Sequence, residues 1–444
     1  MKADVAVIGG GVAGTVAALR ARAAGRQVVV LSAGWGASAL TSGCVGLAHQ
    51  AICGPSRTGR EAVTALLRTS SAHPYNLVPG VTNALSEAIR FFRAGPASPP
   101  LRGASPDDLP LLLADDRGGL RLADLAAESH ARGDLRKSHA TIGVVDPIGL
   151  SWFQAHSVAK GLSRSLAAAC SAGVISAAPN VAVVGLDYFR RQSDSLTTAT
   201  DSARLLDVEG AAARFSAAIG EALALAPVDL LLFPPLIGVD ATDAILDRIE
   251  AENKVVCAEM VGTSPGPSGL RFQRALEAML AHAGVPIIRA RVSAAPDDCV
   301  AALSGGRTRT LARLACGDGA APKNVEARAF VLASGRYIGG GVEGTRPWAE
   351  GVLGFPIAAR GEFLERESSA ALTRDDPFEA QSLFAAGVRV DAELRPLARD
   401  RRPLYANVFA AGDLLAGHDG VVDGSAMGVA LLTGHLAGRN AAAI

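Results

Sequence analysis

The sequence has no excess of either charge, because 43 Lys and Arg residues are balanced by 43 Asp and Glu residues. A balanced chain has no overall field that would recruit nucleic acid or an anionic membrane surface. We therefore expect neither a nucleic acid nor a directly bound membrane among its partners.

Cysteine is scarce and scattered: six cysteines stand among 444 residues, and no two of them form a C-x-x-C arrangement. This pattern disfavours a disulfide framework, and it lacks the spacing of iron–sulfur and zinc sites. We expect free, buried thiols and no metal centre.

Long uninterrupted hydrophobic runs are also missing. The two most apolar stretches, residues 165–186 and 221–239, both contain prolines and polar residues. A membrane-spanning helix tolerates these poorly, so we expect helix-then-strand segments instead. An apolar strand begins within ten residues of Met1, which leaves no room for a signal peptide before it, and we expect a cytoplasmic protein.

What the sequence does contain is a nucleotide fingerprint at its start. A β-branched run at 3–8 predicts a buried strand, an Ala-rich run to Gly25 predicts a helix, and residues 27–31 predict a second strand. At the first turn, one glycine permits the tight bend, one admits a pyrophosphate and one lets helix and strand pack closely. The helix start offers free N–H groups to phosphate. The expected cofactor-binding residues here are Gly9, Gly11, Val12, Ala13 and Gly14.

Two other interpretations bear on this motif. The same glycines could form only a tight turn, and the strand–helix–strand context is what favours nucleotide binding. A second copy of the spacing, at Gly339, Gly341 and Gly344, has no helical run after it, because Pro347 follows. We expect no nucleotide turn there.

The acid that usually follows the second strand is absent. Ser32 stands in its place, and no Asp or Glu occurs between Asp4 and Glu61. A hydroxyl can still bond a ribose, although more weakly than a carboxylate. No Arg or Lys directly follows the strand, which argues against a 2′-phosphate. Ser32 is therefore a candidate ribose contact, and the nucleotide stays open.

The loop at 34–43 is rich in small residues and hydroxyls. After a dinucleotide unit, it could lay backbone N–H groups and the side chain of Ser42 against a flat ring system, and Gly43 belongs to the same candidate site. The alternative is a solvent-exposed turn.

Two later segments repeat the design of a buried strand that ends in small residues. The first ends at Ser334 and Gly335, and the second, at 407–413, ends at Gly412 and Asp413. Gly428 then lies in the opening turn of a final helix. These strand ends let the backbone approach a ligand closely, and they suit a second polar ligand segment.

The remaining chain predicts three segments: a nucleotide domain over 1–60, a substrate or cap region over 61–265, and the return to the nucleotide domain over 266–444. Residues 60–135 are expected to be helical with loops, and strands are expected at 180–186 and 229–236. A helix from 270 to 284 should precede a strand at 285–292 and a hairpin of strands at 299–303 and 308–316. Arg271 could meet an anion or be an ordinary surface charge.

Together, the N-terminal fingerprint and the two later strand ends resemble the FAD-dependent oxidoreductases with two dinucleotide-binding domains. This resemblance implies an α/β fold, with a Rossmann-like FAD-binding domain that has a β-meander and an inserted α+β substrate or cap domain. It also implies that Gly412 and Asp413 face the ribityl and phosphate groups of the flavin, and that the backbone of Val292 faces the adenine.

A closer similarity is to the family of B subunits of anaerobic glycerol-3-phosphate dehydrogenase. It is carried by Ser42-Gly43 and by residues 265–271, 331–341 and 383–438. The resemblance implies a flavin described as FMN, a catalytic flavoprotein subunit and an iron–sulfur subunit as partners, and peripheral association with the inner face of the cell membrane through them. The fingerprint itself favours FAD, because FMN has neither pyrophosphate nor adenosine; FMN is kept as the alternative.

Three functions follow. The chain could be a flavin-dependent subunit that passes electrons from glycerol 3-phosphate oxidation toward a quinone, a self-contained flavin dehydrogenase of another small molecule, or an assembly subunit without redox turnover. No arrangement of catalytic residues stands out, so no acid or base is assigned. His49 and His418 are interpreted as ordinary loop histidines rather than flavin neighbours.

Overall fold

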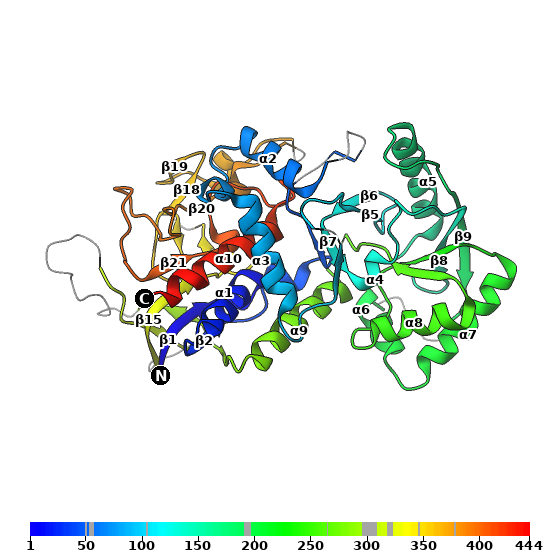
Figure 1. Cartoon of the computed structure of the whole chain (residues 1–444), viewed down its shortest axis with the longest axis horizontal. Coiled ribbons are helices and arrows are strands. Elements are labelled where there is room, and N and C mark those ends of the chain that lie inside the picture. Colours follow the sequence, from blue (N-terminus) through cyan, green and yellow to red (C-terminus); the bar gives the residue numbers. More distant parts are fainter. Residues whose placement is uncertain are drawn as a thin grey trace.

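The computed structural model describes residues 1–48, 51–52, 57–103, 105–190, 197–263, 265–294, 309–317, 323–344, 347–376 and 379–444. These residues form two lobes along the long axis of the molecule (Figure 1). The lobe at the left of this view holds both chain ends, and the lobe at the right is built from the middle of the chain.

A seven-stranded sheet organises the first lobe. The order is β12-β2-β1-β15-β14-β13, and β21 also pairs with β15. Strands β12, β2, β1, β15 and β21 are parallel, whereas β13, β14 and β15 form an antiparallel meander. The bounds are β1 Lys2–Ile8, β2 Val28–Ser32, β12 Ile287–Arg289, β13 Val292–Ser293, β14 Arg313–Cys316, β15 Lys323–Leu332 and β21 Val408–Ala410. The Rossmann-like sheet with its meander is therefore confirmed.

Apolar strands and close helix packing explain this lobe. The side chains of β2 are buried on both faces of the sheet, as expected of a parallel strand between two others. Helices α1 (Val12–Ala23) and α10 (Ala426–Ala442) pack together, because Gly434 and Gly438 let α10 approach the backbone of α1. A Cβ at either glycine would lie 2.4 Å from a carbonyl oxygen of α1.

Helices α2 (Gly59–Thr69) and α3 (Val81–Ala94) belong to the same core, although most of their residues follow the expected boundary at residue 60. Val63, Leu85 and Phe92 lie in one buried cluster with β1 and β15, and α3 contacts α10. We therefore propose that the inserted region begins after α3.

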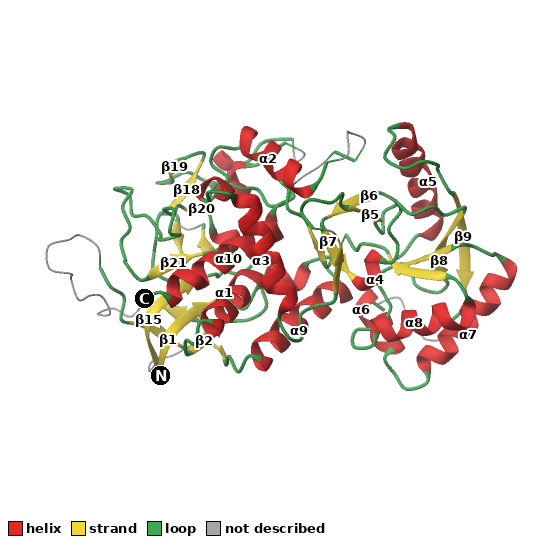
Figure 2. Ribbon diagram, viewed as in Figure 1, coloured by secondary structure: helices red, strands yellow, loops and turns green. Residues whose placement is uncertain are grey.

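The second lobe is centred on a four-stranded parallel sheet of order β11-β10-β8-β9. Figure 2 shows helices α5, α7 and α8 around this sheet. The bounds are β8 Thr141–Pro147, α5 Ala155–Ser171, β9 Asn180–Leu186, α6 Ala199–Leu206, α7 Ala211–Leu225, β10 Leu230–Phe233, α8 Thr242–Asn253 and β11 Val256–Glu259. The strands expected at 180–186 and 229–236 are confirmed, the second in shorter form.

Two small antiparallel sheets join the lobes, in a region that the sequence predicts as helical. Strands β3, β7 and β4 form one sheet and β5 and β6 form the other, followed by the short helix α4. Their bounds are β3 Cys44–Val45, β4 Leu101–Gly103, β5 Leu111–Ala114, β6 Leu120–Ala123, β7 Leu125–Ala127 and α4 Glu128–Ala131. The helical expectation over 101–127 is wrong, because Leu and Ala favour helices locally and cross-strand pairing overrides that preference here.

The return to the first lobe begins with α9 (Pro267–His282), as expected. The hairpin strand expected at 299–303 lies outside the described residues, and β14 is the described part of the strand expected at 308–316. Further short elements are β16 Val342–Glu343, β17 Ala349–Glu350, β18 Ile357–Ala359, β19 Glu362–Phe363 and β20 Gly387–Val388, with 3₁₀ turns η1 Ala37–Leu40, η2 Pro74–Leu77, η3 Ser369–Leu372, η4 Ser382–Ala385 and η5 Gly412–Leu414. Within the described ranges, none of the helices has the length and apolar character needed to cross a membrane.

Candidate cofactor-binding site

The turn after β1 is built so tightly that it requires glycine. Gly9 has a φ of +113°, and a Cβ on it would lie 2.1 Å from the carbonyl oxygen of Ala333. A Cβ on Gly14 would lie 1.9 Å from the carbonyl oxygen of Gly9. The turn, the first helix and the end of β15 are therefore in direct backbone contact, as the fingerprint predicts.

A serine from the next loop stands at the start of α1. The N–H of Val12 donates a hydrogen bond of 3.1 Å to Ser38 Oγ, and a Cβ on Gly11 would lie 2.9 Å from that oxygen. The hydroxyl thus lies where the free N–H groups of a helix attract a phosphate. Sequence analysis selected Ser42 in this loop and missed Ser38, whose position depends on how η1 folds.

Ser42 and Gly43 face the joining region. His130 Nε2 lies 3.0 Å from the carbonyl oxygen of Ser42, and the N–H of Ala127 donates to the carbonyl of Gly43 at 3.1 Å. Gly43 has a φ of +82°, which favours glycine. These contacts fix the loop between the two lobes.

Ser32 is buried at the end of β2, and its hydroxyl donates to the carbonyl of Gly34 at 2.8 Å. Its proton is therefore committed within the chain. Beside it, Gln273 of α9 donates from its side-chain amide to the carbonyl of Gly10 at 3.2 Å. Helix α9 thus braces the glycine turn, a contact between distant segments that no local pattern indicates.

The end of β15 forms a compact loop that carries an unsatisfied hydroxyl. Gly335 has a φ of +73°, and Gly339 and Gly341 fold back onto it. Within the described residues, Ser334 Oγ is buried and has no hydrogen-bond partner. Such a group is rare, because burial without a partner costs free energy. No helix follows Gly344 directly, as expected for the second glycine spacing.

The third segment meets the first at Gly412. Gly412 has a φ of +75°, and a Cβ on it would lie 2.7 Å from the Cβ of Ala13. Its N–H donates to Thr433 Oγ1 at 2.8 Å, which ties it to α10. The terminal strand end is thus pressed against the first turn of α1.

Arg336 joins the second segment to the third. Its guanidinium donates to the carbonyls of Asp413, Leu415 and His418 at 3.0, 3.2 and 3.1 Å. Its Nη2 also lies 3.4 Å from Asp413 Oδ1, and its side chain is only 5% exposed. Burial raises the pKa of Asp413, and Arg336 opposes that rise. Sequence analysis did not select Arg336, although an Arg directly after a buried strand that ends in Ser-Gly is a usable signal.

Two other expected residues lie at the periphery of these contacts. Val292 is in β13, paired with Cys316. A Cβ on Gly428 would lie 2.2 Å from the phenolic oxygen of Tyr75, so helix α10 needs glycine there to pack. Whether Val292 and Gly428 contact a cofactor remains a prediction.

The histidines and Arg271 are placed differently from a loop surface. His418 is 1% exposed and lies against His73, with ring centroids 5.7 Å apart. His49 lies outside the described residues. Arg271 Nη1 lies 2.5 Å from Oε2 of the buried Glu259, and its Nη2 donates to the carbonyl of Ile237 at 2.9 Å. Arg271 therefore joins α9 to the second lobe and is not an ordinary surface charge.

The residues present fit a dinucleotide. The glycine turn leaves no room for side chains, the helix start presents an N–H group to a hydroxyl oxygen, and Ser334 offers a buried, unpartnered hydroxyl close to the same turn. Pyrophosphate and ribityl groups supply the acceptors and donors that such groups need.

Comparison with known proteins agrees. Residues 4–429 match a family model described as FAD binding domain. The B subunit of anaerobic glycerol-3-phosphate dehydrogenase from Vibrio cholerae serotype O1 (strain ATCC 39315 / El Tor Inaba N16961) is 26% identical over 443 residues, 98% of this chain and 95% of that one. The probable B subunit of the enzyme of the same name from Halobacterium salinarum (strain ATCC 29341 / DSM 671 / R1) is 27% identical over 469 residues, 100% of this chain and 98% of that one.

Among solved structures, 3-ketosteroid Δ1-dehydrogenase from Sterolibacterium denitrificans aligns with a TM-score of 0.44 and 12% identity, over 100% of this chain and 99% of that one. The 3-ketosteroid Δ4-(5α)-dehydrogenase from Rhodococcus jostii RHA1 aligns with a TM-score of 0.41 and 13% identity, over 99% and 97%. Because the family model matches nearly the whole sequence, the chain belongs to this FAD-binding family of flavin-dependent oxidoreductases, with FAD as its cofactor.

Proposed function

We propose that the chain is a subunit of a glycerol-3-phosphate dehydrogenase that passes electrons from glycerol 3-phosphate oxidation toward a quinone. The similarity to two proteins named as the B subunit of such an enzyme, over nearly the whole chain, supports this proposal. FAD supplies two-electron redox chemistry when bound, and the protein's part is to hold and orient it.

The observation that carries the proposal is the meeting of three distant segments at the start of α1. Gly9 touches the end of β15 at Ala333, and Gly412 touches α1 at Ala13. Arg336 then ties the second segment to the third through the carbonyl of Asp413. A single extended ligand can contact all three segments only if they converge in this way.

We further propose roles for the residues around this point. The N–H groups at the start of α1 and the hydroxyl of Ser38 hold phosphate, and Ser334 bonds a polar group of the same ligand. The predicted FAD-binding residues are Gly9, Gly11, Val12, Ala13, Gly14, Ser32, Ser42, Gly43, Val292, Ser334, Gly335, Gly412, Asp413 and Gly428. Of these, Ser32 has a weak case, because its proton is already donated to Gly34.

Partner subunits are part of the proposal. The relatives are named as the B component of an enzyme with several subunits, which supports work beside a catalytic flavoprotein and an iron–sulfur protein. Through such partners the chain would associate with the inner face of the cell membrane.

The test begins with the purified chain, alone and co-expressed with candidate partner subunits. The protein is denatured and the released nucleotide identified by chromatography, and we expect FAD. Glycerol 3-phosphate is then added anaerobically, and we expect the visible absorbance of oxidised flavin to bleach only in the assembled complex and to return on addition of a soluble quinone.

Each other outcome points elsewhere. If the chain alone is reduced by a different small metabolite, it is a self-contained dehydrogenase. If folded chain releases no nucleotide, it is an assembly subunit, and the proposed function is wrong.

A further inference from the structure

A buried pair of histidines lies directly behind the terminal strand end, outside the nucleotide fingerprint. His73 precedes η2, and His418 lies in the loop between η5 and α10. Each is 1% exposed, and their rings meet edge to face with centroids 5.7 Å apart. Two segments far apart in the chain thus bring two imidazoles together beside Asp413.

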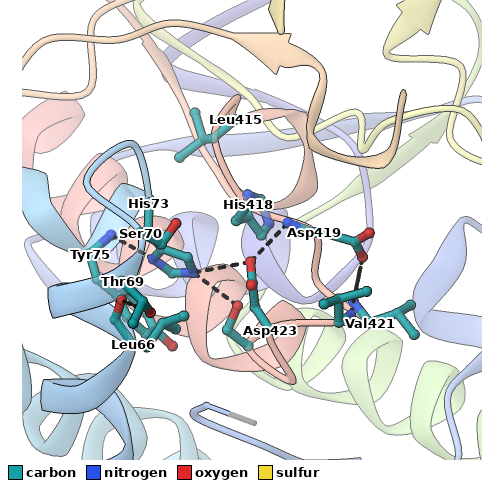
Figure 3. A network of polar contacts seen from close by, with 12 residues as sticks. Leu66, Thr69, Ser70, His73, Tyr75, Leu415, His418, Asp419, Val421 and Asp423 are labelled. Carbon is teal, nitrogen blue, oxygen red and sulfur yellow. Dashed lines mark hydrogen bonds and ion pairs between the residues drawn. The ribbon is translucent and has the colours of Figure 1, made fainter. Parts of the chain in front are cut away.

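The protonation of His73 is fixed by its hydrogen bonds (Figure 3). Its Nδ1 accepts from the backbone N–H of Tyr75 at 3.2 Å, so in the neutral ring the proton resides on Nε2. Nε2 lies 3.0 Å from Ser425 Oγ and 4.0 Å from Asp423 Oδ2. Burial lowers the pKa of His73 to about 4, so this ring is neutral at physiological pH.

His418 has no such partner. Within the described part of the chain, neither of its ring nitrogens makes a hydrogen bond, although both are buried. Its Nε2 lies 3.7 Å from Asp413 Oδ1, just beyond hydrogen-bond distance. An imidazole that is buried, unpartnered and next to a carboxyl group is a candidate for moving a proton rather than for holding the fold.

Arg336 sets the geometry of this pair. It donates to the backbone carbonyls of both Asp413 and His418, so the two side chains are carried on one braced loop. The side chain of Asp413 is 40% exposed, whereas that of His418 is fully buried. Asp413 therefore connects the buried imidazole to the face where the resemblance places the flavin.

The charges around the pair bring the proton affinities of its members closer together. Burial, then Arg336, then His73 lower the pKa of His418 well below its ordinary value. Burial raises the pKa of Asp413, against Arg336 and with the help of Asp419. A proton passes most readily between groups of similar affinity. The charged or titratable groups facing His418 are Asp413, Arg336, His73, Asp419 and Asp423.

We propose that Asp413 and His418 form a proton-transfer pair for the flavin chemistry of this chain, acting on a substrate with a secondary alcohol. This rests on the proposed function. When the alcohol is oxidised to a ketone, the C–H hydrogen leaves with its electron pair as hydride to FAD. The O–H proton is taken by the Asp413 carboxylate and shared with His418 Nε2, while the remaining O–H electrons form the C=O bond.

The test uses the FAD-loaded protein and measures the reduction potential of the bound FAD against pH, by anaerobic equilibration with a reference dye. Two-electron reduction adds negative charge to the flavin, and this charge raises the proton affinity of groups beside it. We expect a bend in the wild-type curve from the pair. Asp413→Asn should remove this bend, and His418→Gln should move it by one pH unit or more.

The matched control is His435→Gln. His435 is also buried, but it contacts Glu87 at 3.3 Å and packs on Phe91, away from the pair. Its curve should overlay the wild type. If Asp413→Asn and His418→Gln keep FAD and their curves also overlay the wild type, the pair is overturned.

Two further outcomes are decisive. If both variants fold but lose FAD, the residues hold the cofactor and not a proton, which also overturns the pair. If His418→Gln does not fold, Asp413→Asn decides alone, because its side chain is partly exposed. Glycerol 3-phosphate reduction of the assembled complex is measured separately: at least tenfold slowing in Asp413→Asn supports the pair, and failure of the wild type overturns only the proposed function.

Discussion

Gly412 and Ala13 stand near opposite ends of the chain, yet a Cβ on Gly412 would lie 2.7 Å from the Cβ of Ala13. The contact joins η5 to the first turn of α1, and the N–H of Gly412 is held at 2.8 Å by Thr433 of α10. This position therefore tolerates no side chain, and the contact locks the terminal segment against the nucleotide turn.

Gly412→Ala should weaken both folding and FAD binding. The backbone strain at φ +75° and the steric clash together should cost about 2–4 kcal/mol in the free energy of unfolding. FAD affinity, measured by fluorescence titration, should fall at least tenfold. The control is Gly25→Ala, where φ is +81° but no heavy atom lies within 4 Å. It should cost only about 1–2 kcal/mol and leave FAD affinity unchanged; equal effects of the two substitutions would contradict the clash.

Gly14→Ala should separate α1 from the turn. Its Cβ would lie 1.9 Å from the carbonyl oxygen of Gly9, so the helix has to move away from β1. We expect FAD to bind more than tenfold more weakly, with a lower melting temperature. In the same loop, Gly10→Ala places its Cβ 3.4 Å from Ser32 Oγ, an ordinary contact, and should retain FAD. Loss of FAD in Gly10→Ala alone would reverse this assignment.

Arg336→Lys should destabilise the terminal loop. Lysine keeps the charge, but its single ammonium cannot reach the three carbonyls that the guanidinium binds. Loss of two or three buried hydrogen bonds should lower the free energy of unfolding by about 2–4 kcal/mol in denaturant titrations. Arg248→Lys, on the half-exposed ion pair with Glu252, serves as the control and should change it by under about 0.5 kcal/mol. A small effect at Arg336 would mean that the loop is held by other contacts.

The stability of the chain should fall as the pH drops from 6.5 toward 4, in part because of His73. Its pKa is 6.5 when unfolded and about 4 when folded, so the unfolded state binds more protons in this window. The full contribution is present above pH 6.5, and about 3 kcal/mol is lost on acidification. The pKa of Glu350, which burial raises to about 7, acts with the opposite sign. The test is therefore the difference between wild type and His73→Gln in unfolding free energy against pH, and the two curves should converge at low pH.

Local sequence was enough to predict the nucleotide turn. An apolar β-branched strand, three spaced glycines and an Ala-rich helix are all read within thirty residues, and each observed element lies within two residues of its expected place. The strand ends at Ser334-Gly335 and Gly412-Asp413 were found in the same way, because a buried run that stops at small residues is a local pattern.

The joining region could not be predicted in this way. The strands of 101–127 are three or four residues long and made largely of Leu, Ala and Arg, which also suit helices. They form because β7 finds partners in β3 and β4, and such pairing depends on segments distant along the chain. The same reason places α2 and α3 in the core of the first lobe.

By itself, the sequence determined that the chain has a dinucleotide turn and two further glycine-ended strands, since these depend on residue type and spacing over short distances. Only the tertiary structure decided that Arg336 clamps the terminal loop, that Ser38 stands at the start of α1, and that His73 lies against His418. Those contacts join segments distant along the chain, and burial and pairing, which give these side chains their chemistry, exist only after the segments have come together.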